Sequence, residues 1–173
     1  MPRTRNTTDD RLLSVYLHDH LAGSAGGVEL ANRVAKSHAG TPIGPALSRL
    51  AREIEEDRDA LRQILSDLRM PEHHVHEGLT WLAEKAARLK PNGQLIGRSP
   101  LSSLIELETM RIALEGKRAG WDTLRLLADD DERLDPGRLE ALIARAIDQA
   151  DRVEELRQAV AGTVFRIDSS QEV

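Results

Sequence analysis

The 173-residue chain contains no cysteine, and this absence excludes disulfide bonds, thiolate metal sites and cysteine nucleophiles. Aromatic residues make up only 2% of the chain, so its core must be built from Leu, Ile, Val and Ala. Because β-strands are enriched in aromatic and β-branched residues, this composition favours packing of helices on helices over a sheet. It also provides no aromatic platform on which single-stranded nucleic acid could stack.

The sequence has no excess of positive charge and no long hydrophobic run. Its 24 basic and 29 acidic residues are interspersed and give a net charge of −5, unlike the basic surface of a nucleic-acid-binding protein. No apolar run approaches the ~18 residues that a membrane span needs. The basic start leads into Asp9 and Asp10 rather than into the apolar core of a signal peptide. We therefore expect a cytoplasmic protein that binds neither nucleic acid nor membranes.

Three capping signals divide the chain into long helical segments. In each, a residue whose side-chain oxygen can accept from the free N–H groups of a helix precedes a proline, which suits the first helical position. The three pairs are Thr41-Pro42, Ser99-Pro100 and Asp135-Pro136. With a start near Thr7, they predict helices over 8–37 and 42–70, a third from Pro100 and a fourth from Pro136.

The lengths of the links predict how these helices are arranged. The first and second helices, and the third and fourth, are joined by short links, so each pair should be antiparallel. About thirty residues separate the second helix from the third, which is enough to cross the bundle. Within them, an amphipathic stretch has apolar residues at Leu79, Leu82, Ala86 and Leu89.

We therefore expect an all-α fold, an antiparallel four-helix bundle over residues 8–167 with one long crossover that carries a short extra helix. Residues 1–7 are expected to be a disordered N-terminus, and residues 168–173 a flexible tail. Trp121 is the expected packing anchor of the third helix, and Trp81 that of the crossover.

Apolar residues at helical spacing predict which side of each helix faces the core. The expected positions are Leu13, Leu17, Leu21, Ala25, Val28, Ala31 and Ala35 in the first helix, Leu47, Leu50, Ile54, Leu61, Ile64 and Leu68 in the second, Leu101, Leu104, Ile105, Ile112, Ala119 and Leu124 in the third, and Leu139, Ile143, Ala146, Ala150, Val153, Val160 and Val164 in the fourth.

The middle of the first helix consists of small residues, from Ala22 to Gly27, and three of them are glycine. Each glycine inside a helix costs about 1 kcal/mol relative to alanine, so this stretch needs a reason. Close approach by a neighbouring helix is the explanation that we favour. The alternatives are a kink, space for a ligand, or a contact surface for a second copy of the chain.

Two acidic segments carry a resemblance to a known family. They are Arg52-Glu53-Ile54-Glu55-Glu56-Asp57 in the second helix and Leu107-Glu108-Thr109-Met110-Arg111-Ile112-Ala113 in the third. With the order of the helices and the long crossover, they make the chain resemble the ferritin-like superfamily, in particular its small bacterial stress-associated members. The resemblance covers residues 8–165 approximately.

This resemblance implies a buried di-metal site, in which two helices each give a Glu and two others each give a Glu-x-x-His pair. Carboxylates with an imidazole suit iron or manganese. The glutamates near the inner faces, and therefore the candidate metal ligands, are Glu29, Glu53, Glu56, Glu108 and Glu154. An α-helix rises ~1.5 Å per residue. If the third helix runs parallel to the second, Glu29, Glu53, Glu108 and Glu154 therefore lie at a comparable depth in the bundle.

The positions where the family would have histidine hold other residues. Arg111 follows Glu108 by three residues, and Arg157 follows Glu154 by three. Arginine has no free lone pair and cannot bind a metal, whereas its guanidinium can neutralise a carboxylate through paired hydrogen bonds. We therefore favour a degenerate site that has become a salt-bridged polar layer.

Histidines offer two further candidate sites. His20 in the first helix leans toward the core and could contact Asp57 of the second, most simply as a structural hydrogen bond. His73, His74, His76 and Glu77 could bind a transition metal, although adventitious surface binding is the simpler use.

Two functions follow as expectations. The first is a non-catalytic ferritin-like bundle, without a cofactor, that works as an interaction or stress-associated protein with a protein partner or as a homo-oligomer. The alternative is a di-iron or manganese carboxylate protein, an oxidase or a metal store, that uses the five glutamates.

Overall fold

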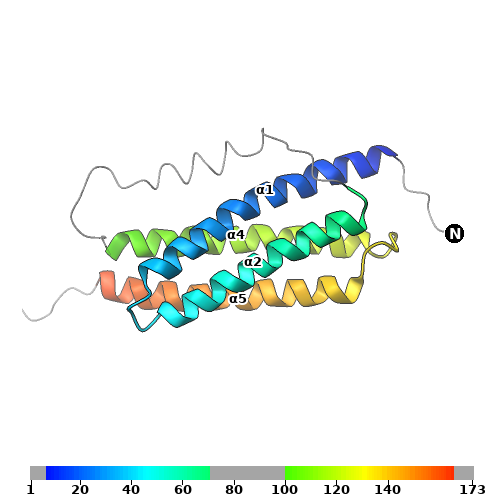
Figure 1. The fold of residues 1–173 in the computed structure, drawn as a ribbon. Coiled ribbons are helices and arrows are strands. Elements are labelled where there is room, and N and C mark those ends of the chain that lie inside the picture. The colour runs from blue at the N-terminus through cyan, green and yellow to red at the C-terminus, as the bar shows by residue number, and fades with distance from the viewer. Residues whose placement is uncertain (1–6, 71–99, 166–173) are drawn as a thin grey trace, which may run out of the picture.

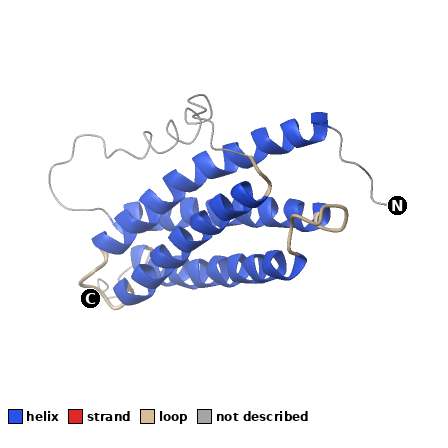
Figure 2. Cartoon of the chain, turned by 45° about the vertical axis from the view of Figure 1, so that its right-hand side comes forward, coloured by secondary structure: helices blue, strands red, loops and turns tan. Residues whose placement is uncertain are grey.

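The computed structural model describes residues 7–70 and 100–165, which form four α-helices without a strand among them (Figures 1 and 2). The helices are α1 (Thr7–Ser37), α2 (Gly44–Asp67), α4 (Pro100–Leu127) and α5 (Pro136–Val164). The all-α class expected from the composition is thereby confirmed. Several expectations concern residues outside the described ranges. They are the crossover helix, Trp81, the candidate site at His73, His74, His76 and Glu77, and the tail at 168–173. None of the four helices has the length and apolar character that crossing a membrane requires.

The four helices pack as two closely associated pairs. α1 lies against α2 and α4 lies against α5, and α1 also contacts α4 (Figure 1). The α2 and α5 backbones, in contrast, are not among the pairs of described helices that approach closely. The short links of the two pairs lie at opposite ends of the bundle (Figure 1).

The apolar interior is divided into two clusters along the bundle. The first cluster is Leu13, Leu17, Leu21, Leu61, Ile64, Leu65, Leu68, Met70, Trp121, Leu124, Leu134, Leu139, Leu142 and Ala146. The second cluster is Leu30, Ala31, Val34, Ala35, Leu47, Leu50, Ala51, Ile54, Leu107, Met110, Leu114, Ala150 and Val153. Each cluster takes residues from all four helices, so burial of apolar surface holds all of them together.

The expected core positions are confirmed for α2 and wrong for much of α4. Every expected apolar position of the second helix is buried. In α4, however, Leu101, Ile105 and Ile112 are 46%, 37% and 69% exposed. Apolar residues occur on two faces of this helix, and its spacing alone cannot tell which face meets its neighbours. The buried face carries Leu107 and Trp121, and Trp121 is the expected packing anchor.

The capping signals hold at one of the two helix starts where the capping residue is described. Asp135 caps α5, because its carboxylate accepts from the backbone N–H groups of Gly137 and Arg138 at 2.9 and 3.3 Å. The prediction for Thr41-Pro42 is wrong. The Thr41 hydroxyl donates to the His38 carbonyl at 2.8 Å, and α2 begins two residues after Pro42, at Gly44.

Gly44 explains this later start. A Cβ atom at this position would lie 2.3 Å from the His38 carbonyl oxygen, so only glycine fits where the link between α1 and α2 folds back. The tight link uses Thr41 and Pro42 for its turn and leaves Pro45 near the first helical position.

α2 also ends earlier than predicted, at Asp67 rather than Met70. Arg69 has a φ of 58°, the left-handed conformation that ends many helices. The Met70 N–H then donates to the Leu65 carbonyl at 2.9 Å and closes the last turn. A non-glycine residue in this conformation carries no sequence signal, so the sequence does not predict that the helix ends before Met70.

α1 is continuous through its small residues, so the stretch from Ala22 to Gly27 does not break the helix. Close approach by one of the described helices does not explain Gly23 or Gly27, because a Cβ at either would have no contact within 4 Å in the part of the chain that the structure describes. α1 and α4 do approach closely one turn before Gly23, at His20, and the glycine that permits this contact belongs to α4. A Cβ at Gly120 of α4 would lie 3.1 Å from the His20 ring of α1.

Candidate functional site

A polar layer separates the two apolar clusters. It consists of Asp57 of α2, Lys117 of α4 and Gln149 of α5, and each of these follows a residue of one cluster and precedes a residue of the other along its helix. Asp57 is 2% exposed, Gln149 is fully buried, and the Lys117 side chain is 17% exposed. The small residues of α1 occupy the corresponding gap between the two clusters in that helix.

The three members of the polar layer bind one another. The Lys117 ammonium donates to Asp57 Oδ2 and to Gln149 Oε1. The Gln149 amide nitrogen donates to Asp57 Oδ2 at 3.1 Å. This closed arrangement satisfies polar groups that would otherwise be costly to bury.

Burial of Lys117 lowers its pKa below the usual value, and the attraction of Asp57 opposes this shift only in part. A buried amine with a lowered pKa is a marker of functional sites, although ion pairs with a purely structural role produce the same shift. Here the same amine is held by a carboxylate and an amide, so its hydrogen-bonding capacity is largely used within the protein.

Arginines of α5 extend the polar layer to the surface. Arg145 contacts Asp57 Oδ1, and it reaches Glu56 at 3.4 Å. Arg152 binds both carboxylate oxygens of Glu53, with 3.2 Å between its Nη1 and Oε1. Burial raises the pKa of Glu53, but the hydrogen bond and charge of Arg152 outweigh this, so the pKa lies below its usual value.

A second charged cluster joins α4 and α5 farther along the bundle. Arg157 donates two hydrogen bonds to the Glu154 carboxylate, from Nε at 2.9 Å and from Nη2 at 2.8 Å. Arg111 donates a third to the same carboxylate at 2.6 Å. Arg157 also lies 3.8 Å from Glu108. The Arg157 hydrogen bonds, with a further one from Gln158, lower the pKa of Glu154 to about 2.

The five glutamates proposed as metal ligands are not gathered around one point but lie mostly with arginines. Glu53 lies with Arg152, Glu56 with Arg145, and Glu108 and Glu154 share Arg157, whereas Glu29 is exposed on α1. Among the described residues, no three His, Asp or Glu side chains are placed to hold one metal ion. The donor set of a di-metal centre is thus not assembled in this part of the chain, and metal binding remains a prediction.

The predicted contact between His20 and Asp57 is wrong. Asp57 pairs with Lys117, Gln149 and Arg145. His20 instead packs edge-on against the Tyr16 ring, with 4.6 Å between ring centroids, and over Gly120. Burial of the His20 ring lowers its pKa, despite the nearby charge of Asp19. His18 is the buried histidine of the pair, and its Nδ1 lies 2.6 Å from the Ser14 carbonyl oxygen.

Sequence reasoning missed Lys117, Gln149 and the arginines that bind the α2 carboxylates, although a signal for the first two was present. Lys117 lies three residues after Leu114 and four before Trp121, and Gln149 lies three after Ala146 and four before Val153. A polar residue at helical spacing within an apolar stripe is a candidate buried polar group. Asp57 shows the same pattern between Ile54 and Leu61.

Comparison of the chain with known protein families, with curated proteins and with solved structures finds no match. The assignment of function therefore depends on the geometry described above.

Proposed function

We propose that the protein is a non-catalytic, antiparallel four-helix bundle of ferritin-like connectivity, in which ion pairs take the place of a metal centre. It would act through its helical surfaces, as an interaction or stress-associated protein. The observation that carries this proposal is the binding of Glu154 by Arg157 and Arg111. Guanidinium groups have no lone pair for a metal and occupy the carboxylate oxygens that a metal would need.

The polar layer supports the same proposal. Asp57 and Glu53, the most buried of the α2 carboxylates, face Lys117, Arg145 and Arg152. Positive side chains this close to the carboxylates would repel a divalent cation as well as compete with it. The layer thus holds helices together by internal compensation of charge.

The alternative is a metal-binding protein that uses the bundle glutamates to bind iron or manganese. One observation favours it: Glu108 and Glu154, from neighbouring helices, share Arg157 and therefore lie near one another. Withdrawal of that arginine would be needed before both carboxylates could bind one ion.

Elemental analysis of the purified protein, before and after addition of iron(II) or manganese(II), tests the proposal. We expect no metal above background and no change in melting temperature. The Glu154→Gln variant is measured in parallel, with Glu155→Gln as the control at a neighbouring exposed position. Metal retained by the wild type and the control, but lost from Glu154→Gln, would establish the alternative.

Sedimentation velocity tests whether a second copy of the chain is the partner. A Gly27→Leu variant fills space on α1 where, among the described residues, a Cβ would meet no atom within 4 Å. If α1 is the contact surface, an oligomer of the wild type should dissociate in this variant. An oligomer that persists would place the contact on another surface.

A further inference from the structure

α4 differs from α2 in the side chains that it exposes to water. From Arg49 to Asp67, every exposed position of α2 carries a polar or charged side chain. In α4, in contrast, most exposed positions are apolar, and Ile112 and Leu126 are 69% and 75% exposed. A helix on the surface of a bundle normally turns a polar face to water, so the outer face of α4 needs an explanation.

The exposed apolar side chains of α4 form one stripe. Ile105, Ile112, Ala119 and Leu126 follow one another at intervals of seven residues, so they line one side of the helix over ~30 Å. Leu101, which is also exposed, lies four residues before Ile105 and extends the same side. We call these five residues the α4 stripe.

The α4 stripe lies on the opposite side of the helix from the buried face. Leu107, Leu114 and Trp121 are buried and are also spaced by seven residues. Each follows a residue of the stripe by two positions, which corresponds to about 200° around an α-helix. Among the described helices, α1 and α5 approach α4 closely, and neither covers the stripe. Two opposite apolar faces are typical of a helix that packs against partners on both sides.

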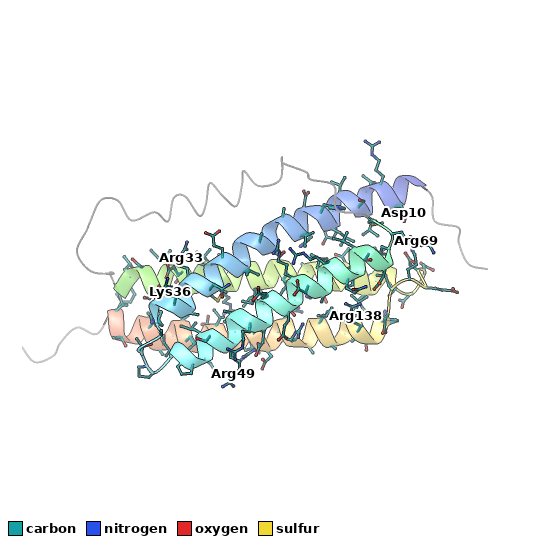
Figure 3. All side chains as sticks on the ribbon, in the orientation of Figure 1. Asp10, Arg33, Lys36, Arg49, Arg69 and Arg138 are labelled. Atoms are coloured by element: carbon teal, nitrogen blue, oxygen red, sulfur yellow. The ribbon has the colours of Figure 1, made fainter. Side chains whose placement is uncertain are left out.

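The charges beside the stripe are compensated within the chain. Glu108 pairs with Arg157 at 3.8 Å. Arg33 of α1, labelled in Figure 3, pairs with Glu106 at 3.5 Å. Every other charged residue of α4 also has a partner of opposite sign within 4.0 Å. The surface around the stripe therefore offers apolar contact without an unpaired charge.

This compensation favours a second copy of the chain as the occupant of the stripe. Oligomers of one chain most often have a two-fold axis, so that a patch meets a copy of itself. An unpaired charge near that axis would face a charge of its own sign, and a chain with a net charge of −5 has little tolerance for further repulsion. A partner recognised by charge would instead require unpaired charges beside the stripe.

We infer that the α4 stripe is the contact surface of a homodimer, in which α4 of one copy packs along α4 of the other. This inference rests on the proposed function as an interaction protein, and it names the surface and the partner. Ile112 and Leu126 supply most of the driving force, because they have the most apolar surface to remove from water.

Sedimentation velocity over a wide range of protein concentration tests the inference. Ala119→Glu places a carboxylate in the middle of the stripe, and Ala144→Glu is the matched control, the same change at an exposed position of α5. Neither variant replaces a buried residue, and circular dichroism checks that both keep the wild-type helix content.

We expect the wild type to sediment as a dimer. Ala119→Glu should raise its dissociation constant about tenfold or more, because the contact would bury a carboxylate without a partner. Ala144→Glu should leave the dissociation constant unchanged. Ile112→Gln removes apolar contact without adding a charge, and it should also weaken the dimer.

Two results would overturn the inference. The first is a wild type that stays monomeric at the highest concentration, whether its stripe then faces water or binds a different protein. The second is a dimer that Ala119→Glu weakens no more than Ala144→Glu does, which would place the contact on another surface. Neither result bears on the absence of a metal centre, and the proposed function fails separately if the wild type retains metal in the elemental analysis.

Discussion

The two apolar clusters and the polar layer between them stabilise the same bundle by different means. In the clusters, leucine, isoleucine and valine from four helices lose contact with water, and the contribution of each depends on how well it is packed. In the polar layer, Asp57 and Lys117 lose hydration, and the loss is offset by their contacts with one another and with Gln149, and by the contact of Arg145 with Asp57. Shortening a residue of a cluster therefore costs stability in proportion to the apolar volume that is removed. The polar layer instead depends on a complete set of partners, because removal of one leaves a buried charge without compensation.

Removal of Asp57 should produce the largest effect of any single change discussed here. The Asp57→Ala variant leaves Lys117 buried without its carboxylate, and we expect a loss of about 3–5 kcal/mol in the free energy of unfolding. Urea denaturation followed by circular dichroism measures this loss. Asp59→Ala is the matched control, since Asp59 is exposed and pairs with Arg62 of its own helix; it should change stability by less than about 0.5 kcal/mol.

A cluster residue provides the comparison with the layer. Leu61, one turn after Asp57, is 5% exposed, and Leu61→Ala should cost about 2–5 kcal/mol because it leaves a cavity. If Asp57→Ala costs no more than its exposed control, the polar layer has no part in stability that differs from that of surface charges.

Two glycines of α4 compare a position on the open surface with one that is packed against α1. They are Gly116 and Gly120. Gly116→Ala should stabilise the protein by up to about 1 kcal/mol, because its Cβ has open space and alanine favours a helix. Gly120→Ala should gain less, since its Cβ would press on the His20 ring. Thermal denaturation measures both.

The His20→Ala background separates these two causes. With the ring removed, the two glycine replacements should become equal in effect. Equal gains in the protein that retains His20 would show instead that the ring moves aside freely.

Acid should remove the contribution of Glu154. Its folded-state pKa of about 2 lies below the ordinary value of 4.5, so this carboxylate stabilises the folded protein above pH 4.5, and the contribution disappears as the pH falls from 4.5 toward 2. Unfolding measured at a series of pH values should show a smaller dependence in Glu154→Gln than in the wild type. Glu155→Gln, at an exposed neighbouring position, should follow the wild type; an identical slope in all three proteins would contradict this assignment.

The sequence predicts the helices well because their signals are local. Asp135 and Pro136 mark the start of α5, and the leucines of α2 repeat at helical spacing. The end of α2 escaped prediction because it depends on the backbone of Arg69. The buried face of α4 escaped because both of its faces are apolar, so only contact with other helices selects Leu107 over Ile105.

The type of contact at the candidate site could be predicted from the sequence, but several of the residues that form it could not. Arg111 and Arg157 follow Glu108 and Glu154 by three residues, which indicated that guanidinium groups face the carboxylates, and Glu154 does bind both arginines. Lys117 and Gln149 were missed because a charged or amide residue is ordinarily assigned to the surface of a helix. Their partners lie 32–92 residues away in the chain, and such pairing depends on packing that no local pattern contains.

The most direct test of the account is a double-mutant cycle on Asp57 and Lys117, with Asp57→Asn and Lys117→Met measured singly and together by urea denaturation. We predict a favourable coupling energy of about 1.5–3 kcal/mol, which is the usual contribution of a hydrogen bond to a charged group and lies in the upper part of the range of about 0.5–3 kcal/mol for residues in one network. The exposed pair of Asp59 and Arg62, treated in the same way, should give about 0.5 kcal/mol or less. A coupling between Asp57 and Lys117 no larger than that of the exposed pair would contradict the claim that compensated charge holds the centre of this bundle.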